Sequence, residues 1–287
     1  MIPFELAEPR SLRKAVALLD PDDPSVRPIA GGTALMLMMK AGLFQPTKLV
    51  SLRRVEARFS SIGRTADGRV RIGALTPLAA LERAPVIRRR LPVVATTLRT
   101  LSNVRVRNVA TLGGHLAHAD PHMDLPPVLI ALGAELLVVG PGGERVVPLA
   151  DLYTGYYETT LARDELIAQV QVHPQAPWRA AYLKCTTRSA DDWPALGLAV
   201  ALTVDGAAVR DIHLVLGAAS ATPTRLTQAE AVLRGAAVDA TALQRAGEAA
   251  AAEAPVIGDP QGSAAYKKAL VRVYVQRAVL QALGGRR

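Results

Sequence analysis

The stretch Thr111-Leu-Gly-Gly-His-Leu-Ala-His-Ala-Asp-Pro-His-Met-Asp-Leu-Pro-Pro127 holds the features on which fold and function depend. It combines two adjacent glycines with three histidines and two aspartates, between apolar segments. Two interpretations compete. Adjacent glycines let a backbone approach a phosphate closely, whereas histidine and aspartate side chains are common metal ligands. The rest of the chain supplies the context needed to choose between them.

The composition is typical of a globular protein with a sizeable core. The chain has 287 residues, 50% hydrophobic and 4% aromatic, and its length suggests about two domains. The single cysteine, Cys185, excludes an internal disulfide and an iron–sulfur cluster held by this chain alone. No secretory signal is evident, and no apolar stretch reaches the ~18–20 residues that span a bilayer. We therefore expect a cytoplasmic protein without a transmembrane segment.

The net charge of +9 comes mostly from scattered arginines. The one tight run, Arg88-Arg-Arg90, has no interleaved aromatic residues that could stack on bases, so it does not predict nucleic-acid binding. We interpret it as a solvated helix end. The excess positive charge is also compatible with an acidic partner or an anionic cofactor.

The N-terminal part is expected to mix short strands and helices. Thr76 is the expected N-cap of one helix, with Pro77 at its first position, and Asp67-Gly68 suits a hairpin turn. Hydrophobic periodicity predicts helices over 11–19, 35–40, 76–82, 93–101 and 126–132. It predicts strands over 26–30, 48–52, 70–74, 135–139, 145–148 and 166–172.

A change of pattern at 173–177, where two prolines interrupt both helix and sheet, indicates a linker. Beyond it we expect a three-stranded antiparallel sheet and then alanine-rich helices. The strands are predicted over 180–185, 195–204 and 209–216, and the helices over 228–233, 240–252 and 264–283. The chain is therefore predicted to be α+β, with domains over 1–174 and 178–287.

The metal interpretation depends on a cluster of side chains. Five potential ligands fall within ten residues: His115, His118, Asp120, His122 and Asp124. Their spacing lacks the histidine pair two residues apart that metallo-β-lactamase-like hydrolases carry. The remaining histidines, His173 and His213, lie in the expected linker and in the other domain. A zinc-dependent hydrolase that uses this cluster remains the alternative function. The simpler explanation is that these histidines lie at the surface and do not act as metal ligands.

The phosphate interpretation depends on two Gly-Gly pairs. Ala30-Gly31-Gly32-Thr33 and Thr111-Leu112-Gly113-Gly114 are both expected to follow strands and to form turns. Two such turns can offer backbone N–H groups to a diphosphate from both sides, without a lysine. Neither a Walker motif nor a Gly-x-Gly-x-x-Gly fingerprint is present. A nucleotide bound here would therefore be held by a less common fold.

Several motifs, in their order and spacing, resemble the FAD-binding medium subunit of the xanthine dehydrogenase and carbon monoxide dehydrogenase family of molybdenum hydroxylases. The resemblance runs nearly end to end. It is carried by Ala30-Gly-Gly-Thr-Ala-Leu35, Ile72-Gly-Ala-Leu-Thr76, Val106-Arg-Asn-Val-Ala-Thr-Leu-Gly-Gly-His-Leu-Ala117, Asp120-Pro-His-Met-Asp-Leu-Pro-Pro127, Leu216-Gly-Ala-Ala-Ser-Ala-Thr-Pro-Thr-Arg225 and Tyr266-Lys-Lys-Ala-Leu270.

The resemblance implies a PCMH-type FAD-binding domain of two subdomains, followed by a small C-terminal domain. The two glycine pairs would meet the diphosphate from opposite sides, and Asp124 would bind ribityl or ribose hydroxyls. Leu166 and Lys184 would lie near the isoalloxazine, where a cation stabilises reduced flavin. The implied cofactor-binding residues are Ala30, Gly31, Gly32, Thr33, Ala34, Leu35, Thr76, Thr111, Gly113, Gly114, His115, His118, Asp120, Asp124, Leu166 and Lys184.

The implied function is electron transfer within a complex. A large subunit with a molybdenum cofactor and a small subunit with 2Fe-2S clusters would be the partners, in a dimer of heterotrimers. Electrons would leave through FAD to NAD, a quinone or oxygen. No catalytic side chain and no metal site is expected in this chain. His115 and His118 depart from the family pattern, which often has Asn or Asp at the position of His115 and Asn at the position of His118. A non-enzymatic basic binding module is a further alternative.

Overall fold

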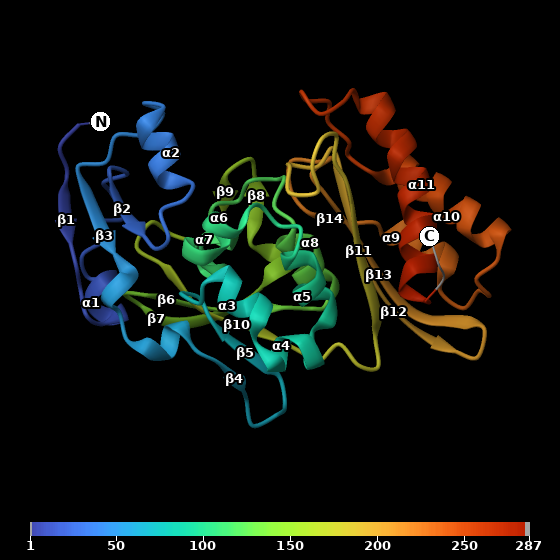
Figure 1. Ribbon diagram of the computed structural model, residues 1–287, viewed down its shortest axis with the longest axis horizontal. Helices are drawn as coiled ribbons and strands as arrows, with labels where there is room; N and C mark the ends of the chain where they lie inside the picture. Colours follow the sequence, from blue (N-terminus) through green and yellow to red (C-terminus); the bar gives the residue numbers. More distant parts are fainter. Residues whose placement is uncertain (1, 285–287) are drawn as a thin grey trace.

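The computed structural model describes residues 2–284 and begins with a small unit of three parallel strands, in the order β1-β3-β2 (Figure 1). Its elements are β1 (Glu5–Ala7), α1 (Leu12–Val16), β2 (Val26–Ile29), α2 (Leu35–Lys40), β3 (Lys48–Ser51) and the 3-10 turns η1 (Leu52–Arg54) and η2 (Ala57–Ser60). Ser11 caps α1 as expected, accepting a hydrogen bond from the Lys14 N–H. Because the strands are parallel, their carboxyl ends share one edge, and the first glycine pair follows β2 there.

The second unit is an antiparallel sheet in the order β4-β5-β10-β6-β7, with helices packed against it (Figure 1). Its strands are β4 (Ile62–Arg64), β5 (Val70–Gly73), β6 (Glu135–Gly140), β7 (Gly143–Pro148) and β10 (Leu166–Val172). Its helices are α3 (Leu78–Arg83), α4 (Pro85–Arg90), α5 (Pro92–Leu98), α6 (Val104–Val109), α7 (Leu112–Ala117) and α8 (Leu125–Ala131). A 3-10 turn, η3 (Leu149–Asp151), and a hairpin of β8 (Tyr153–Gly155) and β9 (Glu158–Thr159) complete it.

The C-terminal domain is an antiparallel sheet in the order β11-β12-β13-β14, with three helices on one face (Figure 1). Its elements are β11 (Arg179–Cys185), β12 (Leu196–Asp205), β13 (Ala208–Gly217), β14 (Thr224–Arg225), α9 (Thr227–Leu233), α10 (Ala240–Glu253) and α11 (Ala264–Ala282). The predicted count of three strands was therefore one short. β14 has only two residues, which is too short for a periodic pattern to reveal.

The alternation along β12 explains how the domains join. Leu198, Val200 and Leu202 face the helices of the C-terminal domain. Ala199 and Ala201 point the other way and belong to the core of the second unit, where α8 contacts β12 and β13. Small side chains on that face let α8 approach closely. One hydrophobic core therefore continues from the N-terminal region into the C-terminal sheet.

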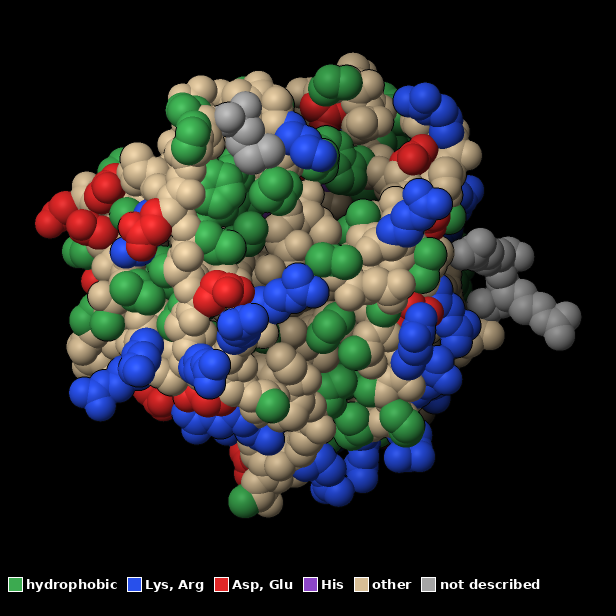
Figure 2. Space-filling view, turned by 60° about the vertical axis from the view of Figure 1, so that its left-hand side comes forward, with side chains coloured by type: hydrophobic (Ala, Val, Ile, Leu, Met, Phe, Trp, Pro, Cys, Tyr) green, Lys and Arg blue, Asp and Glu red, His purple; other side chains and the backbone are tan. Residues whose placement is uncertain are grey.

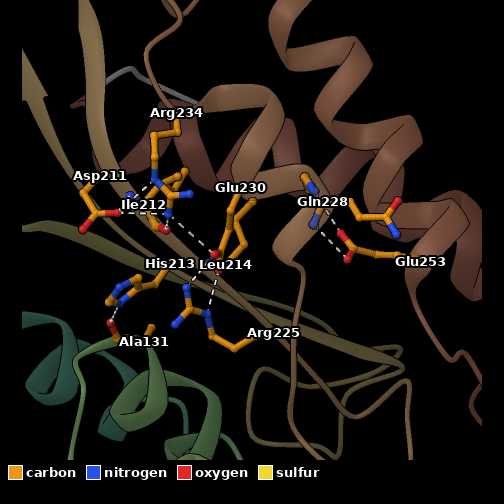
Figure 3. Close-up of polar contacts among 11 residues, drawn as sticks. Ala131, Asp211, Ile212, His213, Leu214, Arg225, Gln228, Glu230, Arg234 and Glu253 are labelled. Carbon is orange, nitrogen blue, oxygen red and sulfur yellow. Dashed lines mark hydrogen bonds and ion pairs between the residues drawn. The ribbon is translucent and has the colours of Figure 1, made fainter.

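A buried carboxylate anchors the edge of the same sheet. The carboxylate of Glu230 accepts hydrogen bonds from the Leu214 N–H at 2.8 Å and from the Arg225 guanidinium (Figure 3). Glu230 is 2% exposed. Because a buried charge is stable only when it is paired and hydrogen-bonded, this contact joins α9 to β13 and β14.

Two local predictions were wrong. The helix expected from Thr76 begins at Leu78, with Pro77 in the capping position. The Leu78 N–H donates to the Ala110 carbonyl instead of to a side-chain cap. The second glycine pair follows helix α6 rather than a strand, because Asn103 accepts a hydrogen bond from the Val106 N–H and starts a helix there.

Figure 2 shows lysine and arginine side chains scattered over one face, several of them side by side along its lower edge, with fewer acidic side chains. Arg88, Arg89 and Arg90 are exposed in the last turn of α4, which confirms the solvated helix end. Within residues 2–284, no helix is long and apolar enough to cross a membrane. Residue 1 and residues 285–287, at the outer ends of the two predicted domains, lie outside the described residues.

Candidate functional site

The first glycine pair forms a loop whose backbone donors are free. Among the described residues, none of the N–H groups at positions 31–35 donates a hydrogen bond to the protein. Gly32 has a φ of +70°, in the left-handed region that favours glycine. Consecutive N–H groups in such a turn form a concave site for an anion. The loop can therefore hold a negatively charged group through its backbone alone.

The second glycine pair has the opposite character, because it lies in the first turn of α7 and its donors are used. The Leu112 N–H donates to the Thr76 carbonyl at 3.0 Å and the Gly113 N–H to the Ala74 carbonyl at 2.7 Å. The Gly114 N–H donates to Oγ1 of Thr111, the N-cap. These hydrogen bonds satisfy donors that a helix start normally leaves open.

Close packing explains why both stretches need glycine. A Cβ atom on Gly31 would lie 2.3 Å from the Val109 carbonyl oxygen, and one on Gly113 would lie 2.6 Å from the Ala74 Cβ. A Cβ on Gly114 would lie 3.8 Å from the Ala30 Cβ. The structure therefore brings the two glycine stretches, 82 residues apart in sequence, into contact at one place, together with the segment 74–76.

Two buried polar atoms near this meeting point have no hydrogen-bond partner within the described part of the chain. They are Oγ1 of Thr76, which is 0% exposed, and Nε2 of His115, which is 7% exposed. Burial and the charge of His118 lower the pKa of His115 to about 3, so this imidazole is neutral at pH 7. Such orphaned groups, beside a cradle of free N–H groups, fit a bound polar molecule.

Asp124 and Lys184 form a buried ion pair across the domain boundary. Lys184 Nζ lies 3.0 Å from Asp124 Oδ2 and 2.7 Å from the Thr100 carbonyl oxygen. The Tyr182 hydroxyl donates to the other carboxylate oxygen at 2.7 Å. Burial raises the pKa of Asp124, while Lys184 and Tyr182 oppose that rise. Both oxygens of this carboxylate therefore already have partners within the protein.

The remaining predicted residues occupy different surroundings. Leu166 is 4% exposed in β10 and belongs to the same hydrophobic cluster as Ala30 and Leu75, beneath the first glycine loop. The His118 ring lies 5.1 Å from the Tyr157 ring. The Tyr157 hydroxyl donates to Asp120 at 3.1 Å.

The histidine cluster does not assemble into a metal centre. Across residues 2–284, no three His, Cys, Asp or Glu side chains are placed to hold a metal ion together. The reason is geometric: His115 is buried in α7, His118 turns to Tyr157, and His122 contacts two carboxylates. The zinc-hydrolase alternative has no support in this arrangement.

Sequence reasoning missed the residues that contact the predicted ones from far along the chain. Tyr157 and Tyr182 bind Asp120 and Asp124, and Asp259 binds His122. No local spacing signals such partners, because they are 37, 58 and 137 residues away in sequence. The fold of the flavin-binding domain brings Tyr157 to Asp120, and the packing of the two domains brings Tyr182 to Asp124 and Asp259 to His122.

Comparison with known proteins agrees with a flavoprotein built on two domains. A family model described as "FAD binding domain in molybdopterin dehydrogenase" matches residues 2–175. A second, "CO dehydrogenase flavoprotein C-terminal domain", matches residues 181–282. The chain therefore belongs to the family of FAD-binding medium subunits of molybdenum hydroxylases. It is an oxidoreductase subunit, and its cofactor is FAD.

Individual relatives share this organisation over their whole length. The carbon monoxide dehydrogenase medium chain of Hydrogenophaga pseudoflava is 33% identical over 281 residues, which cover 97% of each chain. The nicotine 6-hydroxylase medium subunit of Paenarthrobacter nicotinovorans is also 33% identical, over 96% of each chain. A solved structure of Hydrogenophaga pseudoflava carbon monoxide dehydrogenase matches with a TM-score of 0.94, 35% identity and 99% coverage of both chains.

Proposed function

We propose that this chain holds FAD at the loop 30–35 and serves as the electron-transfer subunit of a molybdenum hydroxylase complex. The observation that supports this most directly is the run of five backbone N–H groups, at positions 31–35, without an acceptor among the described residues. A diphosphate offers several anionic oxygens to such a loop.

The two glycine stretches would contribute to FAD binding in different ways. Gly31, Gly32 and Thr33 would donate to the diphosphate. Thr111, Gly113 and Gly114 would shape the opposite wall, since their helix already uses its first N–H groups. The other residues proposed for the site are Ala30, Ala34, Leu35, Thr76, His115, His118, Asp120, Asp124, Leu166 and Lys184.

FAD supplies the redox chemistry when it is bound. The protein's part is to bind the cofactor, orient it and limit its contact with water. Gly31 and Gly113 keep the surrounding segments at close distance. The neutral imidazole of His115 adds an uncharged, buried polar group within α7.

The proposed partners are a large subunit with a molybdenum cofactor and a small subunit with 2Fe-2S clusters, in a dimer of heterotrimers. The relatives are named medium chains or complex subunits, which agrees with a heteromeric assembly. The small subunit would deliver electrons to this one, and NAD, a quinone or oxygen would take them away. The two-domain division at 174–178 and the cytoplasmic location stay predictions.

Titration of the purified protein with FAD tests the proposal. We expect quenching of flavin fluorescence with one FAD bound per chain, and release of FAD on denaturation. Binding of FMN should be weaker, because FMN lacks the diphosphate. A protein that binds neither flavin, alone or in its purified native complex, would contradict the proposal.

A further inference from the structure

His122 lies between two carboxylates. Its Nδ1 is 3.0 Å from Asp120 Oδ1, and its Nε2 is 3.1 Å from Asp259 Oδ2. A neutral imidazole has one N–H and one lone pair, so it can donate to only one of these carboxylates. The other ring nitrogen would then place its lone pair against a carboxylate oxygen. Only the imidazolium, with two N–H groups, satisfies both contacts.

Two further side chains donate hydrogen bonds to the same carboxylates. Together with His122, Asp120 and Asp259, they form a hydrogen-bond network. Lys267 Nζ donates to Asp259 Oδ2 at 2.6 Å and to the Ala218 carbonyl at 3.2 Å, and its side chain is 0% exposed. The Tyr157 hydroxyl donates to Asp120. Lys267 supplies one positive charge to the two carboxylates, so a charged His122 would balance a group that is largely withdrawn from water.

The Trp193 ring lies against the His122 ring, on one side of the network. The two rings stack with centroids 5.3 Å apart and 12° between the ring planes. Parallel stacking on an aromatic face favours a cationic partner. The stacking is therefore a second observation, independent of the hydrogen bonds, that favours the charged form of His122.

The network crosses the boundary between the two domains. Asp120 and His122 follow α7 in the flavin-binding domain, whereas Asp259 and Lys267 belong to the C-terminal domain. The Ala218 N–H also donates to the Pro121 carbonyl at 2.9 Å. The segment 120–122 is therefore the point where the chain leaving the second glycine pair meets the C-terminal domain.

We propose that His122 is a positioning residue that, as an imidazolium, holds the C-terminal domain against the segment 120–122 of the flavin-binding domain. This goes beyond FAD binding, because it assigns a charged contact to the docking of the two domains. It would act on the cofactor site only through the placement of α7. Loss of the proton would remove one of the two hydrogen bonds and set a lone pair against a carboxylate.

The expected pH dependence is set by the charged and titratable groups around His122. These are the carboxylates of Asp120 and Asp259. Next to these carboxylates lie Lys267, Tyr157 and His118. Burial lowers the pKa of His122, but the hydrogen bonds and charges of Asp120 and Asp259 outweigh it and raise the pKa above its ordinary 6.5. A raised histidine pKa stabilises the fold fully below pH 6.5 and ceases to do so as the pH rises through the folded pKa.

His213 is a matched control, because it is another half-buried histidine that joins the domains. Its Nδ1 lies 2.7 Å from the Ala131 carbonyl oxygen (Figure 3). Its ring lies 4.8 Å from the Trp178 ring. The Ala131 contact pairs one ring nitrogen with a neutral acceptor. It therefore needs a single N–H and no charge.

NMR titration of the 15N-histidine-labelled protein tests the proposal without FAD. We expect both ring nitrogens of His122 to be protonated at pH 6.5, with a midpoint above that value. A midpoint at or below 6.5, or a single-tautomer neutral ring at pH 6.5, would overturn the proposal. Since the titration uses the unaltered protein, its outcome is independent of whether FAD binds.

Two variants test whether the second ring proton of His122 stabilises the docking of the two domains. Thermal unfolding of the unaltered protein should occur at lower temperature as the pH rises above 6.5, and His122→Gln should lose this dependence. His213→Gln should keep it. If His122→Gln retains the dependence, His122 does not carry it and the proposal fails. If His122→Gln does not fold, the NMR midpoint still decides.

Discussion

The two glycine pairs have similar sequences but use their backbones in opposite ways. Within residues 2–284, the N–H groups at positions 31–35 have no acceptor, whereas those of Leu112, Gly113 and Gly114 are hydrogen-bonded. A Gly-Gly pair can therefore be a ligand cradle or a packing device. What distinguishes them is whether the neighbouring structure already satisfies the donors. We accordingly expect changes near the first pair to affect FAD, and changes near the second to affect stability.

The largest effect should come from Gly32→Val. Gly32 has a φ of +70°, and a β-branched side chain would strain this turn and crowd the free N–H groups. We expect FAD affinity to fall by about 100-fold, or ~2.8 kcal/mol, in fluorescence titrations. Gly42→Val is the control, because Gly42 has a φ of +72° and open space around it. Equal losses of affinity in both variants would mean that backbone strain, not the cradle, is responsible.

Lys184 pairs with Asp124, which follows the second glycine pair in sequence, and Lys184→Met should mainly destabilise the protein. It leaves the buried Asp124 carboxylate with Tyr182 as its remaining partner. Removing one member of a buried pair costs about 3 kcal/mol in the free energy of unfolding, measured by urea denaturation of the FAD-free protein. Arg272→Met breaks an exposed pair with Glu248 and should change little. Loss of FAD from a Lys184→Met protein of unchanged stability would contradict this expectation, because it would show that the contact of Lys184 with FAD outweighs its role in the buried pair.

Thr111→Val tests the role of the second glycine pair at the first turn of α7. The variant removes the hydroxyl that accepts the Gly114 N–H. Loss of an N-cap lowers the free energy of unfolding by about 1 kcal/mol, which denaturation should detect. FAD affinity should change far less than in Gly32→Val. A drop in affinity as large as that of Gly32→Val would show that the second stretch also supplies ligand contacts.

The smallest effect concerns the neutral His115. Its pKa is lowered to about 3, so the unfolded chain binds a proton near pH 6.5 while the folded protein does not. Stability should therefore decrease as the pH falls toward and below 6.5, by about 0.7 kcal/mol between pH 7 and pH 6. His115→Asn should lack this contribution. The measurement is the difference between the two proteins at each pH, which cancels the titration of other groups.

Local patterns predicted most elements of this fold because their signals lie within a few residues. Ser11 caps α1, and Asp67-Gly68 turns between β4 and β5, as expected. The strand expected before Thr111 is a helix, since Val104 and Val106 suit either structure and only the cap at Asn103 distinguishes them. The contacts of Asp120 and Asp124 were beyond prediction, because their partners come from other elements.

Hydrogen exchange tests the contrast between the two glycine pairs most directly. In the FAD-free protein, the amides of 31–35 should exchange fast and those of Gly113 and Gly114 slowly, because only the latter are hydrogen-bonded. Addition of FAD should protect 31–35 and leave Gly113 and Gly114 nearly unchanged. If FAD binds while 31–35 continue to exchange fast, or if the new protection appears at 112–114 instead, the cradle is not where we have placed it.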